Sequence, residues 1–380
     1  MTFGSKRTIF VVLTVAVCLG ITTKSSQGRQ ADRPLLAEEA FKNIKVIKGI
    51  PVDEFMDTMG MFSASTNMNC VDCHTEDSTA HWENFAKDTP EKETTRRMVL
   101  MVNAINKDNF KGVREVSCYT CHHGDRAPKK VPSLIVQYSA PLEDPNEIEN
   151  FPNTKGPSAE QIFDKYIQAL GGAQRLGNMR SFSAKGTYSG YDTEQANVPV
   201  EIFAKMPGQR SAIVHAGFGD SVRTYDGRAA WIASADKPLP LMQLTGGNLD
   251  GAKIEAMVLF PQQIKQAFSQ WRVTSTVIED REVRVLQGTN PRQAPVNFYF
   301  DDSGLLTRLV RFVDTAVGRV PTQIDYSDYR DVAGIKMPFK WIATWTDGQS
   351  TTQLSEVQPN VPIDDGKFAK PAPAPPPKLQ

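Results

Sequence analysis

The segments NMNCVDCHTED at residues 67–77 and CYTCHHGDR at residues 118–126 share one pattern: two cysteines separated by two residues, with a histidine directly after the second. The chain has 380 residues but only five cysteines and five histidines. Random placement would produce one such pentad on the order of once in a thousand sequences. Two pentads therefore indicate a chemical purpose, and Cys70, Cys73, Cys118 and Cys121 all lie inside them.

The pentads supply the groups that covalent haem attachment requires. Two thiols add to the vinyl groups of the macrocycle, and the adjacent histidine becomes the proximal ligand of the iron. The sequence therefore predicts two covalently bound c-type haems, with His74 and His122 as proximal ligands. Two alternatives use the same cysteines: a zinc site of four thiolates and a pair of disulfides. Both leave the two histidines unexplained.

A low-spin c-type haem needs a sixth ligand, and a methionine thioether in this place raises the potential. Met56, Met59, Met61 and Met68 precede the first pentad. Met68 lies too close to Cys70 to reach the opposite face of the haem. Met56 and Met59 are three residues apart on a predicted helix.

Residues 88–110 read as a second helix, with Asp88 or Thr89 as the cap and Pro90 at the start. Met98, Met101 and Ile105 recur at the spacing of one helical face, together with Val102. One of these methionines can face the second iron. A methionine stripe at this spacing is also typical of plain core packing, so that alternative stays open.

Residues 41–74 and 92–128 together resemble the cytochrome subunit of photosynthetic reaction centres and its non-photosynthetic relatives, over about a quarter of the chain. The resemblance implies that each haem unit is a helix with the axial methionine, a turn and a CxxCH helix. It points to Met59, eleven residues before Cys70, and to Met98, with Met101 as the alternative. The chain departs from that family in having two pentads instead of four, and Phe110 where the family has a further ligating histidine.

The N-terminus is typical of an export signal. Lys6 and Arg7 precede an apolar run of roughly 13 residues, shorter than the ~20 that span a bilayer. We expect a signal peptide at residues 1–30, with an uncleaved membrane anchor as the alternative, and a periplasmic location.

The 43 basic and 43 acidic residues balance, so no global charge recruits nucleic acid. Arg96, Arg97, Arg126, Lys129 and Lys130 are candidates to pair with haem propionates or are solvated charges.

The second half of the chain differs from the first in composition and in its pattern of apolar and polar residues. After the haem region at residues 31–136, residues 137–157 are rich in Pro, Asn and acidic groups and predict a linker. Ser158 and Gln161 form a capping box for a helix that ends at Gly171 or Gly172. Alternating apolar and polar runs between DG, SG and PG turns then predict a long antiparallel sheet over residues 158–366, with a helix at 250–268. A Pro-rich tail follows at 367–380.

The phrases RTYDGRAAW, FYFDDSGLLTRL and DYRDVAGIKMPFKW are similar in turn pattern to the periplasmic lipoprotein-carrier and lipoprotein-sorting superfamily. That resemblance implies a curved antiparallel half-barrel around an apolar groove plugged by helices, with a possible hydrophobic ligand. The predicted fold class is thus multidomain: an α-helical dihaem cytochrome c domain followed by an α+β half-barrel.

These inferences favour electron transfer between periplasmic or membrane redox proteins, with His74 and Met59 on one iron and His122 and Met98 on the other. No catalytic residue emerges from the sequence. One alternative is a haem enzyme, such as a peroxidase or small-molecule reductase, with one open iron site. Another is a lipid- or lipoprotein-binding protein whose haems sense redox state.

Overall fold

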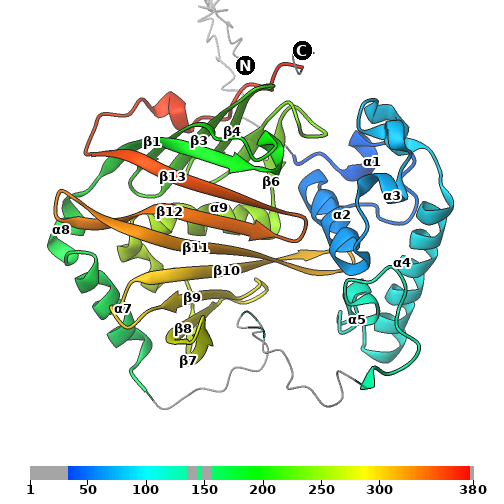
Figure 1. Ribbon diagram of the computed structural model, residues 1–380, viewed down its shortest axis with the longest axis horizontal. Coiled ribbons are helices and arrows are strands. Elements are labelled where there is room, and N and C mark those ends of the chain that lie inside the picture. Colours follow the sequence, from blue (N-terminus) through cyan, green and yellow to red (C-terminus); the bar gives the residue numbers. More distant parts are fainter. Residues whose placement is uncertain (1–32, 135–143, 145, 147–155, 377–380) are drawn as a thin grey trace, which may run out of the picture. The chain divides into compact units, whose positions relative to one another are not determined.

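The computed structural model describes residues 33–134, 144, 146 and 156–376 (Figure 1). The predicted signal peptide, most of the predicted linker and the last four residues lie outside the described residues. From Pro34 onward the chain forms one compact unit. Within the described ranges, no helix has the length and apolar character needed to cross a membrane.

The first region is helical. It contains α1 (Ala37–Ala40), α2 (Val52–Thr66), α3 (Cys70–Cys73), the 3₁₀ turns η1 (Glu76–Ser78) and η2 (Trp82–Ala86), α4 (Pro90–Asn109) and α5 (Cys118–His122). Helix α4 begins where the sequence predicts, because the Thr89 hydroxyl accepts from the backbone N–H of Lys92 at 3.2 Å and Pro90 is the first helical residue. Helix α2 ends at Asn67, which adopts the left-handed conformation.

The second region combines helices with one large sheet. Its helices are α7 (Ala159–Ala169), α8 (Ala173–Asn178) and α9 (Gly246–Val258), with the 3₁₀ turns η3 (Tyr191–Thr193), η4 (Pro261–Gln266) and η5 (Asp365–Phe368). Its strands are β1 (Ser181–Gly190), β2 (Val198–Lys205), β3 (Gln209–Ala216), β4 (Gly219–Tyr225), β5 (Ala230–Ala233), β6 (Met242–Leu244), β7 (Gln270–Ile278), β8 (Arg281–Thr289), β9 (Val296–Phe300), β10 (Leu306–Thr315), β11 (Gly318–Val332), β12 (Ile335–Trp345) and β13 (Gly348–Pro359).

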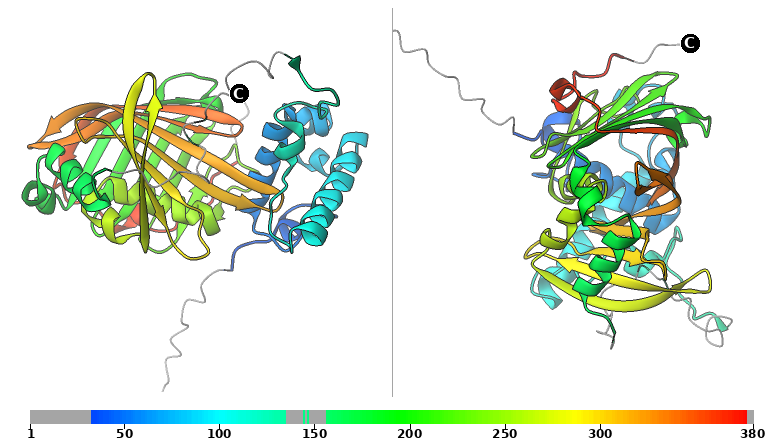
Figure 2. Two further views of the ribbon diagram at one scale, coloured as in Figure 1. Left: turned by 90° about the horizontal axis from the view of Figure 1, so that it is seen from below. Right: turned by 90° about the vertical axis from the view of Figure 1, so that its left-hand side faces the viewer.

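The thirteen strands form one antiparallel sheet in the order β6-β5-β4-β3-β2-β1-β13-β12-β11-β10-β9-β8-β7. Two meanders are therefore joined through the pairing of the first strand with the last. Figure 2 shows the sheet bent around the helices of this region. The predicted fold class, a helical region followed by an α+β antiparallel-sheet domain, is confirmed.

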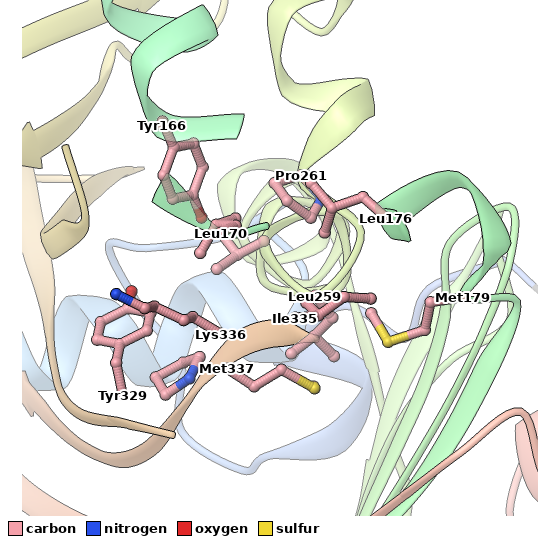
Figure 3. Close-up of a pocket in the computed structure, with 12 residues that line it drawn as sticks. Tyr166, Leu170, Leu176, Met179, Leu259, Pro261, Tyr329, Ile335, Lys336 and Met337 are labelled. Atoms are coloured by element: carbon pink, nitrogen blue, oxygen red, sulfur yellow. The ribbon is translucent and has the colours of Figure 1, made fainter. Parts of the chain in front are cut away.

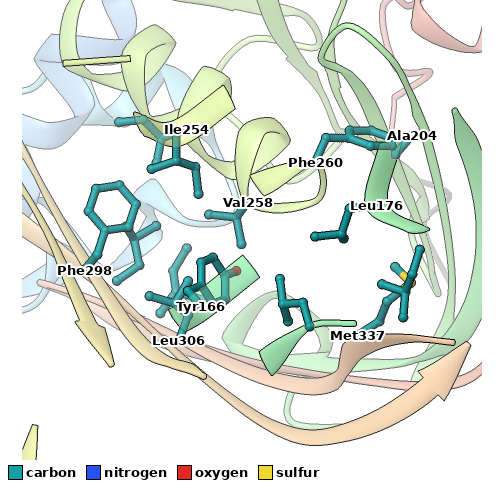
Figure 4. Close-up of a cluster of buried hydrophobic side chains, with 14 of the residues drawn as sticks. Tyr166, Leu176, Ala204, Ile254, Val258, Phe260, Phe298, Leu306 and Met337 are labelled. Carbon is teal, nitrogen blue, oxygen red and sulfur yellow. The ribbon is translucent and has the colours of Figure 1, made fainter. Parts of the chain in front are cut away.

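The main apolar core lies on the inner face of this sheet, beneath α7, α8, α9 and η4. Tyr166 of α7 and Val258 of α9 pack with Phe298 and Leu306 of the strands (Figure 4). Burying one large apolar side chain contributes about 1.5–3 kcal/mol, so this layer supplies much of the driving force for folding.

The predicted helix at 250–268 is two elements. Helix α9 begins earlier, at Gly246, and ends at Val258, while η4 occupies Pro261–Gln266. Pro261 lacks a backbone N–H and cannot continue the preceding helix. Inside the predicted tail, Phe368 is fully buried, and the backbone N–H of Ala374 donates to the carbonyl of Pro240 at 2.8 Å.

The two regions share a small core. Met61, Val99 and Cys118 of the helical region cluster with Val313, Val317 and Val320 at the β10–β11 hairpin. The contact is close, because a Cβ added at Gly318 would lie 2.5 Å from Cε of Met61. Polar contacts join the regions at a second place, the start of α9, where Asp53 of α2 accepts from the backbone N–H of Thr245 at 2.6 Å and from its hydroxyl at 2.8 Å.

Candidate functional site

The first pentad forms a short capped helix. The Asn69 side chain accepts from the backbone N–H groups of Val71 and Asp72 at 3.0 and 3.2 Å, and Asp72 accepts in return from the backbone N–H of Asn69 at 2.8 Å. This capping box holds α3 in helical form although it has only four residues. Cys70 and Cys73, three residues apart, therefore lie on one face of α3.

His74 is oriented by a backbone carbonyl. Its Nδ1 lies 3.1 Å from the carbonyl oxygen of Phe85, and its ring meets the Phe85 ring edge-on at 4.8 Å. Because a carbonyl only accepts, this contact places the proton on Nδ1 and leaves Nε2 as the basic nitrogen. Burial and the charge of Lys92 lower the pKa of His74, which favours the neutral imidazole that binds metals.

The second pentad repeats this arrangement. Ser117 and Thr120 form the capping box of α5, through Thr120 N–H to Ser117 Oγ at 3.3 Å and Ser117 N–H to Thr120 Oγ1 at 3.0 Å. His122 places Nδ1 at 2.9 Å from the carbonyl oxygen of Asp125. In both histidines Nε2 is thus the basic nitrogen. The hydrogen bond from Nδ1 to a backbone carbonyl orients the ring, as is common for metal-binding imidazoles.

Two buried hydrogen-bond networks position the pentads. Asn106 of α4, 5% exposed, donates to the carbonyl of Val116 at 2.7 Å and accepts from the N–H groups of Glu115 and Val116 at 3.1 and 2.9 Å. The Thr89 hydroxyl donates to the carbonyl of Cys73 at 2.6 Å. The sequence predicts Thr89 as a helix cap but gives no sign of its contact with Cys73, and it assigns no role to Asn106. For Asn106 there was a signal, because asparagine is unfavourable inside a helix unless its side chain has a specific partner.

The four cysteines of the pentads are free thiols. Burial raises the pKa of Cys118 to about 11, and burial with nearby acidic charge also raises the pKa of Cys70 and Cys73. Among the described residues, no three His, Cys, Asp or Glu side chains gather in a metal-binding group.

The methionines of α2 differ in their surroundings. Met56 packs into the cluster of Phe41, Val52 and Leu244, and Met61 is buried against Gly318. Met59 is half-buried and belongs to neither cluster. Of these three methionines, Met59 is therefore the one whose thioether packs in neither apolar cluster.

The predicted methionine stripe of α4 lies beside the buried face. Val99, Val102 and Asn106 form that face, while Met98, Met101 and Ile105 are each one residue before them. Met98 is half-buried and Met101 is 44% exposed. The expectation that all four predicted positions form one buried stripe is thus wrong for Met101, because the polypeptide covers only the neighbouring face of α4.

Large apolar side chains are exposed on the helical region. They are Leu35, Trp82, Leu100, Met101, Phe110, Val113, Tyr119, Val131 and Leu134. Of these, Tyr119 lies inside the second pentad. Among the candidate propionate partners, Arg96 is committed elsewhere, since it pairs with Asp88 and Glu93.

The sheet domain contains a small apolar cavity between α7, α8, α9 and β12 (Figure 3). Leu170, Leu176 and Met337 are among its lining residues. Its volume, about 20 Å³, is room for about one water molecule. Side chains thus fill this part of the inner face, and an acyl chain would require the helices to move.

The haem region matches a known family. Residues 21–166 match the family described as "Photosynthetic reaction centre cytochrome C subunit". The photosynthetic reaction center cytochrome c subunit of Thermochromatium tepidum is 36% identical over 97 residues, which are 24% of this chain and 23% of that protein. The subunit of Rubrivivax gelatinosus is 33% identical over 100 residues, 25% of each chain. The chain thus spans about a quarter of the length of these relatives, and the resemblance seen in the motifs is confirmed for the N-terminal region.

The sheet region has weaker likenesses. Residues 225–355 match a family of unknown function. A solved LolA superfamily protein from Nitrosomonas europaea superposes with a TM-score of 0.39 and 13% identity, covering 57% of this chain and 99% of that one. A putative outer membrane lipoprotein-sorting protein domain from Vibrio parahaemolyticus gives 0.37 and 8%, covering 56% and 98%.

Proposed function

We propose that this protein is a dihaem c-type cytochrome that carries electrons between periplasmic or membrane redox proteins. The observation that carries the proposal is the repeated geometry of the pentads. Each places two thiols on one face of a capped helix and follows them with a histidine whose Nδ1 is bound to a backbone carbonyl. The similarity of residues 21–166 to a cytochrome c family supports the same chemistry.

The described residues fit two haems. Cys70 and Cys73 would hold one through thioether bonds, and Cys118 and Cys121 the other. Bound haem supplies a one-electron iron couple. The carbonyls of Phe85 and Asp125 keep each imidazole in one tautomer and orientation, and this contact also makes the imidazole a stronger ligand.

Methionine is the proposed sixth ligand of both irons. Met59 is the candidate for the His74 haem, because its neighbours Met56 and Met61 are engaged in apolar packing. Met98 is the candidate for the His122 haem, with Met101 as the alternative on the same stripe of α4. Two complete ligand sets leave no open iron position, so the role is electron transfer without substrate chemistry.

The proposed location is periplasmic. Lys6, Arg7 and the apolar run after them have the order of an export signal, and covalent haem attachment suits that compartment. Electron donor and acceptor would dock by local surface patches, since the chain carries no net charge.

The haem content of the exported full-length protein tests this proposal. We expect two haems per chain, and one in a variant with Cys118→Ala and Cys121→Ala. The oxidised spectrum should be low-spin with a methionine-to-iron charge-transfer band. A high-spin component that reacts with peroxide would instead favour the haem-enzyme alternative, and a chain without haem would refute the proposal.

A further inference from the structure

Three arginines converge on one carboxylate inside the sheet domain. Arg210 of β3, Arg223 of β4 and Arg311 of β10 place guanidinium nitrogens at 3.9, 3.2 and 3.4 Å from the carboxylate oxygens of Glu255, which lies on α9. These four residues are called the arginine cluster below.

Strand register explains why the arginines meet. Arg210 pairs with Ala204, and Arg223 pairs with Ala212 on the neighbouring strand. Paired residues of antiparallel strands point to the same face, and Ala204 belongs to the main core. The arginines of β3 and β4 therefore occupy inward-facing positions that apolar side chains normally fill.

Helix α9 closes over the cluster. A Cβ added at Gly251 would lie 2.6 Å from Cζ of Arg311, so the backbone of α9 rests on that guanidinium. The side chain of Arg311 is 7% exposed and that of Glu255 is 11% exposed. Arg223, 33% exposed, lies at the open side of the cluster.

The charges of the cluster do not balance. Burial alone would raise the pKa of Glu255, but the arginines outweigh it and the pKa lies below its usual value, so the carboxylate is ionised. Asp57 of α2 is the other acidic group whose charge acts on Arg311. Glu255 and Asp57 are thus the acids whose charges act on Arg311, against three guanidinium groups, which lose little of their charge on burial because their pKa is so high.

Several donors of the cluster have no acceptor. Within the described residues, Nε and Nη1 of Arg311 and Nε of Arg223 are buried without a hydrogen-bond partner. A buried donor on a charged group is costly to leave unpaired. In both Arg223 and Arg311 the Nη2 atom already contacts Glu255, so the unpartnered N–H groups are separate donors to which an anion could add as an acceptor.

We propose that the arginine cluster binds an anion, a carboxylate or phosphate group that enters beside Arg223 and accepts hydrogen bonds from the unpartnered N–H groups of Arg223 and Arg311. Binding requires α9 to shift outward, because the unpartnered atoms are enclosed in the present arrangement. The anion is either free or the head of an amphiphile. Val258, one turn beyond Glu255 on α9, borders the small apolar cavity, which the same shift of α9 would have to widen before a short tail could enter it.

Calorimetric titration of the full-length haem-loaded protein tests the proposal with three probes: octyl phosphate, inorganic phosphate and 1-octanol. We expect octyl phosphate to bind and 1-octanol, which lacks the charge, not to bind. Comparable affinity for inorganic phosphate identifies a free anion as the ligand. Binding of octyl phosphate alone identifies an amphiphile head.

Two arginine variants complete the test. Arg223→Gln removes one of the proposed contacts and should weaken phosphate binding on the order of tenfold or more, as expected for a hydrogen bond to a charged group. Arg228→Gln is the matched control, since Arg228 is exposed at the turn after β4. Unchanged haem spectra and melting temperatures verify that both variants fold. Absence of binding by both phosphate probes, or equal binding by the Arg223→Gln protein, would make the cluster a structural ion network and overturn the proposal.

Discussion

Replacing Met59 by leucine tests the axial-ligand assignment most directly, because Met61 provides a control on the same helix. Met59 is half-buried and outside the apolar clusters, whereas Met61 is 5% exposed and packs at the β10–β11 hairpin. Leucine and methionine have similar volumes, so each exchange costs less than about 1.5 kcal/mol of unfolding free energy. The larger cost belongs to Met61, since branched leucine must fit against Gly318.

The effects of the two substitutions on the haem potentials should follow the opposite order from their effects on stability. Axial ligands set haem potentials over a range of about 0.8 V, and a thioether lies toward its high end. Met59→Leu should therefore lower one of the two potentials by on the order of 0.1 V and remove about half of the methionine-to-iron band. Met61→Leu should leave both potentials and the band unchanged while lowering the denaturation midpoint slightly.

Spectroelectrochemical titration of wild type and both variants measures these outcomes in one experiment. Urea unfolding, followed by circular dichroism, supplies the stability comparison. The reasoning fails if Met59→Leu leaves both potentials in place, or if Met61→Leu is the variant that loses the band. Either result would mean that apolar packing is a poor guide to which thioether is free for iron.

Three further changes have distinct expected outcomes. Asn106→Ala removes three hydrogen bonds and should cost about 2–4 kcal/mol of unfolding free energy, while exposed Asn109→Ala should cost little; urea midpoints compare them. Asp53→Ala removes the carboxylate that caps α9 and should cost about 1–3 kcal/mol, measured by thermal melting, with a smaller loss for Asp53→Asn. Hydrogen bonds from Lys45 and Arg96 hold the pKa of Asp88 well below its ordinary value of 3.8. The ionised Asp88 therefore stabilises the protein at pH values above about 4, and this stabilisation is lost progressively as the pH falls further. The stability difference between wild type and Asp88→Asn should therefore shrink from pH 7 to pH 3; a constant difference would contradict it.

Local signals in the sequence predicted the elements that depend on local contacts. Thr89 and Pro90 start α4, and Ser158 and Gln161 form the capping box of α7, both at the expected positions. The sequence also predicted the end of α7 near Gly171. A Cβ at Gly171 would lie 2.3 Å from the carbonyl oxygen of Gly334, and its φ of +121° suits glycine.

The sequence was a poor guide where the stabilising partner is distant in the chain. Helix α9 begins four residues before the predicted helix, and Thr245 at its N-cap makes no side-chain cap. The cap comes from Asp53, 192 residues earlier. Similarly, Val99 is buried in the cluster that includes the β10–β11 hairpin, and no periodicity of α4 alone distinguishes its face from the methionine face.

The arginine cluster had a sequence signal that was not used. In QRSAIVHA, the residues that share a face with Arg210 are Ala212 and Val214, and in RLVRFV the neighbours of Arg311 by alternation are Leu309 and Val313. A charged residue in an apolar row predicts a buried ion or a ligand contact. What the sequence could not supply is the pairing that brings β3, β4 and β10 to the same carboxylate.

Helix α2 packs on both regions, and this links the sheet to the proposed ligand Met59. Asp53 near its start caps α9, and Met61 near its end packs on the β10–β11 hairpin, with Met59 between them. A ligand held by a helix that is fixed on both sides keeps its position in both oxidation states, and such rigid support is what a functional site requires. The sheet thus contacts α2 on both sides of Met59, and if Met59 is the proposed ligand, an anion that shifts α9 would act on it through the Asp53 contact.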